Sequence, residues 1–194
     1  MAESSVVAQQ ALVWEGTTRS PEETRTLAAG LAAVARAGDR VGLVGELGAG
    51  KTEFARGFAL GLGIREVVNS PSFALMQEYA GRLPLFHLDV YRLKGSADAL
   101  AGGLLDERQE DGVSLIEWAD HLDGPLAVFD AVVRLQGAVG KTRRVRVEAA
   151  GASGARYVEA AREAAREAAR HACTAVRVAG TAVPGRAVPG RAGR

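Results

Sequence analysis

The fold of this chain is decided by the stretch VGLVGELGAGKT, residues 41–52. Its first four residues form an apolar run that is too short for a helix and is typical of a buried strand. Residues 45–52 fit the pattern GxxxxGK[ST] in full, and the chain from there to about residue 62 has apolar side chains at helical spacing. The stretch therefore predicts a strand, a glycine-rich turn and a helix in succession, which is the context in which this pattern binds phosphate.

The glycine-rich turn, a P-loop, is chemically suited to hold a triphosphate. Its glycines let the backbone bend so that successive N–H groups point inward, and the helix that starts near Gly50 places its partial positive end at the phosphates. The ammonium of Lys51 would reach the outer phosphates, and the hydroxyl of Thr52 would bind magnesium. The alternative is a glycine-rich turn with a surface lysine. We predict that ATP and Mg²⁺ bind here, with contacts from Gly45, Glu46, Leu47, Gly48, Ala49, Gly50, Lys51 and Thr52.

The chain before the P-loop predicts a short strand and a helix. The strand is expected at residues 11–14. Residues 20–23, with the sequence SPEE, supply an N-cap, a proline at the first helical position and a glutamate that closes a capping box. A helix is therefore expected from there to about Arg36, where Gly38 and Asp39 stop it.

After the P-loop helix, extended and helical segments continue to alternate. The expected elements are extended segments at residues 66–75 and 83–93, a mostly helical segment at 97–110 despite two internal glycines, a buried strand at 113–118, and an antiparallel hairpin built from 126–135 and 142–148. The predicted fold class is α/β, with a P-loop NTPase-like sheet of mostly parallel strands, flanking helices and a C-terminal antiparallel hairpin.

Charge divides the chain into a body and a tail. Residues 1–150 carry 16 basic and 20 acidic side chains, whereas residues 151–194 carry 8 and 3, which together give the net charge of +1. The mildly acidic body has no general attraction for nucleic acid, so an RNA contact would be local, shared with a partner or made by the tail. We predict a P-loop ATPase domain over residues 1–151.

The tail, residues 152–194, is rich in alanine and arginine and low in complexity. It contains AREAAREAAR at residues 161–170 and a doubled VPGRA at residues 183–192. Alanine, glutamate and arginine favour helix, although ion pairs three residues apart add only about 0.2–0.5 kcal/mol each. We expect a solvated or fraying helix and then a disordered basic end, with an RNA-contacting arm as the alternative.

Composition also excludes several kinds of site. Cys173 is the only cysteine, so the chain has neither an internal disulfide nor a cysteine zinc cluster, which fits a reducing compartment. The three histidines are too scattered for a metal motif. No signal-peptide pattern opens the chain, and no stretch approaches the roughly 20 apolar residues that a membrane span needs. We expect a cytoplasmic protein without membrane contact.

Four segments, in order along the chain, resemble the TsaE family. They are GELGAGKTEFARGF at residues 45–58, NSPSF at 69–73, HLDVYRL at 87–93 and LIEW at 115–118. The resemblance covers roughly residues 14–151 and leaves the tail outside. It implies an ATPase subunit of the bacterial machinery that makes threonylcarbamoyladenosine beside the anticodon of tRNAs. Such a subunit would work with TsaB and TsaD and would meet tRNA only through that complex.

The segment around Asp89 alternates, with His87, Asp89 and Tyr91 predicted on one face of a strand. A half-exposed edge strand is the simpler interpretation of this alternation. The resemblance implies instead that Asp89 lies near the phosphates and the attacking water. We expect His87 to be a hydrogen-bonded structural histidine and assign it no chemical step.

Glu117 follows the apolar run of residues 113–116 and so stands at the carboxyl end of a core strand, where open α/β sheets bind ligands. The resemblance implies that Glu117 helps Thr52 to hold magnesium, directly or through water. A solvated acid at a strand end is the alternative. Trp118 could stack on a base or a partner, but packing is the more common role of such an aromatic residue.

Two departures from the family pattern concern single residues. The family's usual SPTF is SPSF here, so Ser72 keeps the hydroxyl that faces the nucleotide but loses the methyl group of threonine. The family's paired glutamates after the tyrosine-arginine segment are absent, and Asp98 is the nearest carboxylate that could replace them.

Other functions fit the sequence less well. A GTPase would need a base-reading segment such as NKxD, yet Asn69 is the only asparagine. A small-molecule P-loop kinase is the second hypothesis, because phosphoryl transfer requires few residues that a sequence motif would reveal. Residues 94–124, however, lack the arginine-rich lid that such a kinase should have. A structural interaction module ranks third. The predicted activity is weak, partner-stimulated ATP hydrolysis without transfer of the threonylcarbamoyl group, and its catalytic residues are Asp89, Lys51 and Glu117.

Overall fold

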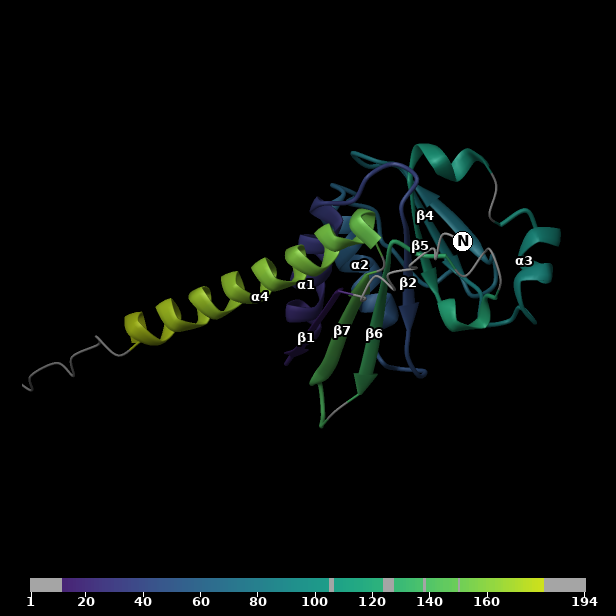
Figure 1. The fold of residues 1–194 in the computed structure, drawn as a ribbon. Coiled ribbons are helices and arrows are strands. Elements are labelled where there is room, and N and C mark those ends of the chain that lie inside the picture. The colour runs from purple at the N-terminus through teal and green to yellow at the C-terminus, as the bar shows by residue number, and fades with distance from the viewer. Residues whose placement is uncertain (1–11, 105–106, 124–127, 138, 150, 180–194) are drawn as a thin grey trace, which may run out of the picture.

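The computed structural model describes residues 12–104, 107–123, 128–137, 139–149 and 151–179, which form one seven-stranded sheet flanked by helices (Figure 1). The strands are β1 (Leu12–Thr18), β2 (Arg40–Val44), β3 (Met76–Tyr79), β4 (Leu85–Asp89), β5 (Val113–Glu117), β6 (Ala131–Gly137) and β7 (Arg143–Ala149). The helices are α1 (Pro21–Ala33), α2 (Lys51–Gly61), α3 (Ser96–Ala101) and α4 (Gly151–Ala179), with 3₁₀ turns η1 (Glu107–Asp111) and η2 (Ala119–His121).

The strand order across the sheet is β1-β7-β6-β2-β5-β4-β3. The central strands β6, β2, β5 and β4 are parallel, whereas β3 is antiparallel to β4 and β7 is antiparallel to β6. β1 pairs antiparallel with β7 and therefore points the same way as the central strands. The predicted α/β fold, with a mostly parallel sheet and a C-terminal antiparallel hairpin, is confirmed.

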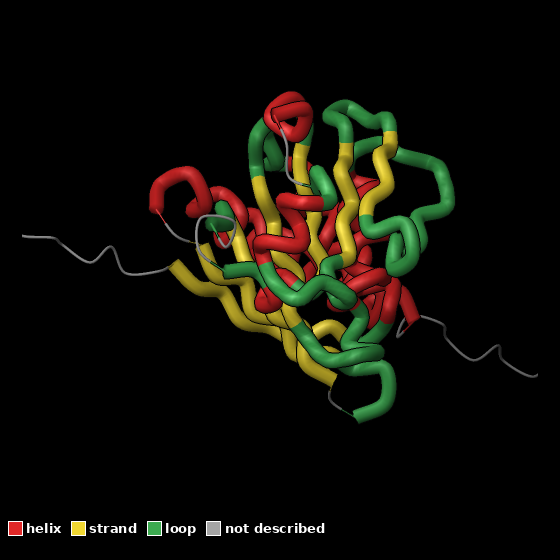
Figure 2. The backbone as a smooth tube through the Cα atoms, turned by 90° about the vertical axis from the view of Figure 1, so that its right-hand side faces the viewer, coloured by secondary structure: helices red, strands yellow, loops and turns green. Residues whose placement is uncertain are grey.

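Helices pack against the sheet (Figure 2). Two clusters of buried side chains lie between these elements. The main core joins α1, α2 and the start of α4 to one face of the sheet. A second cluster lies on the other face around β4 and β5, against α3 and η2. The neighbours Leu115 and Ile116 belong to different clusters because successive strand residues point to opposite faces. This double burial explains why β5 reads as a continuous apolar run.

β4 is an internal strand and not the half-exposed edge strand that the alternation allowed. It lies between β3 and β5, and all five of its residues are buried. His87 and Asp89 are therefore polar side chains inside the fold, and a buried polar group needs a partner. The burial of these two residues favours a functional or bonded role over simple exposure.

α1 begins as the sequence predicts. The Ser20 hydroxyl accepts a hydrogen bond from the Glu23 N–H at 3.2 Å, and Pro21 is the first helical residue. The Glu23 carboxylate binds the N–H of Arg19 at 2.7 Å, so the capping box closes one residue earlier than expected. The helix ends at Ala33, short of the predicted Arg36.

Two expected elements are wrong. Residues 66–75 contain no strand, because the side chain of Arg56 binds the carbonyl of Val68 at 2.8 Å and the amide oxygen of Asn69 at 3.0 Å, which holds the segment as a loop. The helix expected at 97–110 is divided into α3 and η1. Gly103 has a φ of +63°, which ends α3.

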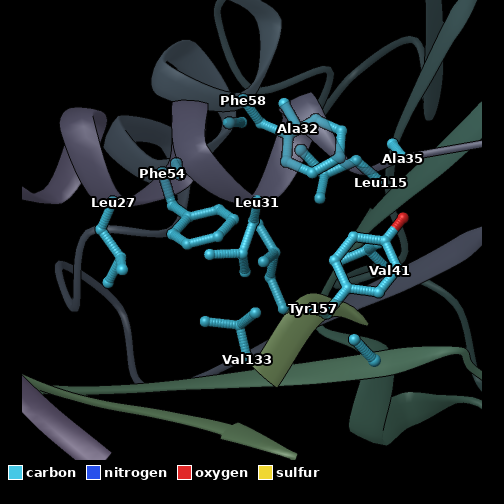
Figure 3. Close-up of a cluster of buried hydrophobic side chains, with 14 of the residues drawn as sticks. Leu27, Leu31, Ala32, Ala35, Val41, Phe54, Phe58, Leu115, Val133 and Tyr157 are labelled. Atoms are coloured by element: carbon cyan, nitrogen blue, oxygen red, sulfur yellow. The ribbon is translucent and has the colours of Figure 1, made fainter. Parts of the chain in front are cut away.

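The C-terminal helix is packed on the body over its first turns, which corrects the expected solvated or fraying helix. Tyr157, Val158 and Ala161 are fully buried, and Figure 3 shows Tyr157 among core side chains of the body. The Tyr157 hydroxyl donates to Asp39 Oδ2 at 2.5 Å, and Arg156 pairs with the same carboxylate. Beyond these turns α4 projects from the body (Figure 1). The prediction of a disordered basic end to the tail falls on residues 180–194, which lie outside the described residues.

Within the described ranges, no helix has both the length and the apolar character that a membrane crossing requires.

Candidate nucleotide-binding site

The P-loop connects β2 to α2 as the sequence predicts. Gly45, Gly48 and Gly50 have φ values of +154°, +77° and +105°, a region that favours glycine. A Cβ on Gly45 would also stand only 2.3 Å from the carbonyl oxygen of Leu135 on β6. The Ala49 N–H donates to the Glu46 carbonyl at 3.1 Å, which tightens the turn. Conformation therefore favours glycine at all three positions, and at Gly45 the lack of space requires it as well.

Lys51 is folded back onto its own loop. Its ammonium donates to the carbonyls of Gly45 at 2.6 Å and Glu46 at 3.0 Å, and it lies 3.4 Å from the ring centre of Trp118. Burial lowers the pKa of Lys51 below its ordinary value of 10.5, while nearby carboxylates oppose the shift. A phosphate would offer this buried cation a stronger partner than carbonyl oxygens.

A hollow of about 390 Å³ opens above the P-loop. Its lining residues come from the P-loop, the 70–72 loop, the ends of β4 and β5, and β7: Leu47, Gly48, Gly50, Lys51, Thr52, Glu53, Ser70, Ser72, Asp89, Tyr91, Glu117, Trp118 and Arg143. The sheet topology explains this convergence. β2, β5 and β4 are parallel neighbours, so their carboxyl ends meet at one edge, where open α/β sheets bind ligands.

Asp89 ends β4 and is held by hydroxyl groups. Ser70 Oγ and Ser72 Oγ donate to Asp89 Oδ2 at 2.5 and 2.8 Å, and the Tyr91 N–H donates to Asp89 Oδ1 at 3.0 Å. The residue is 3% exposed. The Ser72 hydroxyl thus orients a carboxylate of the hollow, and its expected contact with a nucleotide stays a prediction.

Glu117 lies beside Asp89, because the two residues are partners in the β4–β5 register. It also pairs with Leu43 of β2, the strand that leads into the P-loop. Glu117 Oε1 lies 3.0 Å from His87 Nε2, while His87 Nδ1 has no hydrogen-bond partner among the described atoms. The expected hydrogen-bonded structural histidine is therefore found, and its partner is a candidate magnesium ligand.

Aromatic side chains form the wall beside Lys51. The ring centres of Tyr91, Trp118 and His121 lie 4.7 to 6.0 Å apart. Trp118 takes the left-handed conformation, with a φ of +63°, so the chain turns sharply after Glu117 and presents the indole to the hollow. The indole contacts the P-loop lysine, which places Trp118 in the site as well as in the packing.

Not every predicted site residue lines the hollow. Ala49 is buried within the P-loop, whereas Gly45 and Glu46 line a neighbouring hollow beside β6, although their carbonyls bind Lys51. Asp98 accepts a hydrogen bond from the Lys94 N–H at 3.0 Å at the start of α3 and is not a lining residue. Its carboxylate therefore bonds the main chain at the start of α3 and is not part of the hollow.

Five lining residues were not among the predicted site residues: Glu53, Ser70, Tyr91, Trp118 and Arg143. Ser70 was noted only as part of a loop, although its hydroxyl binds Asp89 as closely as that of Ser72 does. Arg143 opens β7, 92 positions beyond Lys51, and reaches the P-loop across the fold. Ser70 could have been found from the SPSF loop, whereas nothing in the sequence distinguishes Arg143 from its neighbour Arg144.

A comparison of the sequence with protein families identifies one that covers most of the chain. The family model described as "Threonylcarbamoyl adenosine biosynthesis protein TsaE" matches residues 18–151. The match contains every lining residue of the hollow and ends where α4 begins.

Curated relatives carry the same name. The tRNA threonylcarbamoyladenosine biosynthesis protein TsaE of Bacillus subtilis is 48% identical over 110 residues, which are 56% of this chain and 68% of the relative. The protein of that name from Treponema pallidum is 36% identical over 130 residues, which are 67% of this chain and 96% of the relative.

A solved structure has the same fold. The crystal structure of YdiB from Bacillus subtilis matches with a TM-score of 0.62 and 33% sequence identity, over 82% of this chain and 99% of that one. The small-molecule kinase hypothesis finds no support in these similarities.

Proposed function

The chain belongs to the TsaE family of threonylcarbamoyladenosine biosynthesis proteins, and from this membership and the site geometry we infer that it supports that biosynthesis by binding and slowly hydrolysing ATP. One observation carries the inference: the P-loop, its buried lysine and two strand-end carboxylates converge on the same hollow. Neutral backbone amides, a cation and hard oxygen ligands are the groups that a magnesium triphosphate requires.

The P-loop would hold the phosphates through its amides and the N-terminal end of α2. Binding would draw Lys51 away from the carbonyls of Gly45 and Glu46 and towards the outer phosphates. Since Lys51 is buried and its pKa is lowered, a phosphate would also stabilise its charged form. Lys51 would then neutralise charge that develops on the transferred group.

The residues of the hollow fit a magnesium ion. The Thr52 hydroxyl and the Glu117 carboxylate are hard oxygen donors, and magnesium usually keeps several waters and binds protein through one or two side chains. Described residues contain no cluster of three or more His, Cys, Asp and Glu side chains suited to a metal. When bound, the ion would neutralise charge on the outer phosphates.

Asp89 would position the attacking water. The hydroxyls of Ser70 and Ser72 fix one carboxylate oxygen and the Tyr91 N–H the other, so the group is oriented before substrate arrives. A carboxylate of this kind orients a water through a hydrogen bond and can accept its proton. His87 would hold the neighbouring Glu117 in place.

We propose that hydrolysis is weak in the isolated protein and is stimulated by TsaB and TsaD, which would carry out the transfer of the threonylcarbamoyl group. The chain would reach tRNA through that complex. The mildly acidic body supports this arrangement, because it offers nucleic acid no general electrostatic attraction. The cytoplasm is the compartment that we propose for this role.

The proposed function is tested by reconstitution. The purified chain is mixed with TsaB, TsaD, tRNA and threonylcarbamoyl-adenylate, and modified tRNA is counted per complex over time in the presence of Mg²⁺ and ATP. We expect repeated turnover with the wild-type chain and none with Lys51→Ala, provided that the variant has the wild-type circular dichroism spectrum. If turnover is unchanged when the wild-type chain is left out, the proposed function is wrong.

A further inference from the structure

Arg143 joins the P-loop to a turn that is distant in sequence. Its Nε donates to the carbonyl of Ala49 at 2.9 Å, and Nη2 donates to that of Gly48 at 3.2 Å. Nη1 donates to the carbonyls of Gly140 at 3.0 Å and Thr142 at 2.8 Å in the β6–β7 turn. The guanidinium therefore bonds two separate stretches of main chain at once.

These contacts fix the direction of P-loop amides. In a trans peptide the carbonyl of one residue and the N–H of the next point in opposite directions. Because the carbonyls of Gly48 and Ala49 face Arg143, the N–H groups of Ala49 and Gly50 face away from it. The Ala49 N–H accordingly points into the loop, where it meets the Glu46 carbonyl. Arg143 thus fixes the direction of two peptide units of the P-loop, and in the free protein the Ala49 N–H is bonded within the loop.

The same contacts argue against a direct part for Arg143 in the chemical step. A guanidinium has five N–H donors, and the hydrogen bonds from Nε, Nη1 and Nη2 use four of them on main-chain carbonyls. An arginine that stabilises a transferred phosphoryl group would need its donors free for phosphate oxygens. The hydrogen bonds of Arg143 therefore brace the P-loop against the β6–β7 turn.

We propose that Arg143 is a positioning residue for nucleotide binding, which braces the Gly48 and Ala49 peptide units against the β6–β7 turn so that the P-loop amides face the phosphates. This proposal rests on the proposed function, since it concerns the same site. It assigns Arg143 an effect on affinity for ATP and none on the rate of the chemical step, because the brace is present in the ground state and in the transition state alike.

The chain offers a matched control beside Arg143. Arg144 is the next residue of β7 and is exposed on the opposite side of the strand. Arg144→Ala removes the same charge and the same side chain without touching the P-loop. Arg143→Lys keeps the charge but loses the fork geometry, so it separates orientation from electrostatics.

Two measurements on the full chain test the proposal. Hydrogen exchange of the free protein measures the exchange rates of the amides of residues 45–52. Calorimetry measures the Kd for Mg·ATP, and steady-state hydrolysis measures the KM and kcat. For Arg143→Ala we expect faster exchange confined to the P-loop, a Kd and a KM raised about ten-fold, and a kcat within about two-fold of wild type. Arg143→Lys should recover only part of the affinity, and Arg144→Ala should behave as wild type.

The proposal is overturned if Arg143→Ala leaves P-loop exchange and affinity at the values of Arg144→Ala. It is equally overturned if Arg143→Lys restores affinity in full, which would make charge the cause, or if kcat falls while KM does not change. Should Arg143→Ala fail to fold, hydrogen exchange of residues 45–52 is measured on Arg143→Lys instead. If the wild type binds no nucleotide, the proposed function fails, whereas P-loop exchange still tests the brace.

Discussion

Lys51 links protonation to nucleotide binding. Its burial lowers the pKa of the ammonium below 10.5, and the first-order effect is that the free protein loses this proton at a lower pH than an exposed lysine does. Phosphate favours the charged form, so binding raises the pKa of Lys51 again. Nucleotide binding therefore takes up a proton in the interval between the two pKa values.

We predict that ATP affinity falls as pH rises, and that the fall begins below pH 10.5. The sign follows because the charged lysine that phosphate needs is depleted as pH passes its lowered pKa. Calorimetry in buffers of different ionisation enthalpy measures the affinity and the proton uptake together. Lys51→Arg is the control, since arginine stays charged over this range and should remove the dependence. A constant affinity up to pH 10.5, with no proton uptake, would contradict this assignment.

Asp89 is predicted to act on the rate of hydrolysis. Asp89→Asn keeps the size of the side chain and an acceptor for the serine hydroxyls, but it loses the negative charge that orients and deprotonates water. We expect kcat for ATP to fall by roughly 10²-fold or more while Kd changes by only a few-fold. Asp98→Asn is the matched control, because that carboxylate lies outside the hollow and should have no effect. Equal rates for the two variants would remove Asp89 from the mechanism.

The pair α1 and α2 shows how the P-loop helix is anchored. A Cβ on Gly57 would meet the Arg25 carbonyl at 2.3 Å. Gly57→Ala should therefore force the helices apart and lower the free energy of unfolding by roughly 1–3 kcal/mol. Gly137→Ala is the control, since its Cβ would meet no atom within 4 Å, and its effect should stay within about 0.5 kcal/mol. Urea denaturation of both variants measures the two free energies of unfolding. Equal midpoints would contradict the close packing of α1 against α2 at Gly57.

α4 is predicted to stabilise the body through Tyr157. Burial raises the pKa of the Tyr157 hydroxyl, which therefore stays protonated and donates to Asp39. Tyr157→Phe leaves that buried carboxylate with one donor fewer and should cost roughly 1.5–3 kcal/mol of unfolding free energy, the range for a hydrogen bond to a charged group. Arg166→Ala, on the exposed part of α4, should cost far less. Similar unfolding midpoints would mean that α4 is not part of the folded body.

Sequence patterns were most informative where short-range chemistry decides the conformation. The P-loop needs glycines at fixed places, and the cap of α1 needs Ser20, so both were predicted within about a residue. Residues 66–75 were predicted wrongly, because a side chain from α2, Arg56, binds the backbone carbonyl of Val68 and the side chain of Asn69. β-propensity alone contains no information about such a long-range contact.

The candidate site was likewise predicted where local sequence patterns decide the structure and missed where contacts between distant residues decide it. Glu117 was predicted from its place at a strand end and Asp89 from the family resemblance, and the β4–β5 register brings the two together. Arg143 was missed because its contact with the P-loop depends on the order of strands across the sheet. The packing of α4 was missed for the same reason, since alanine-rich composition predicts a helix but not the surface that covers it.

The whole chain combines a family body with an additional helix. The TsaE match ends at residue 151, where α4 begins, and the first turns of α4 complete the main core. The domain boundary that we predict at residue 151 therefore coincides with the end of the family match. It does not coincide with the end of the packed core, because the first turns of α4 belong to that core. A protein cut there would expose the apolar surface that Tyr157 and Val158 cover.

All functional statements depend on the binding of a magnesium triphosphate above the P-loop. Isothermal titration calorimetry of the full chain with a non-hydrolysable ATP analogue measures this binding. We predict uptake of about one nucleotide per chain, weakened when Mg²⁺ is removed and lowered more than about ten-fold in affinity by Lys51→Ala. Folded protein that takes up no adenine nucleotide with Mg²⁺, even when TsaB and TsaD are present, would contradict the account.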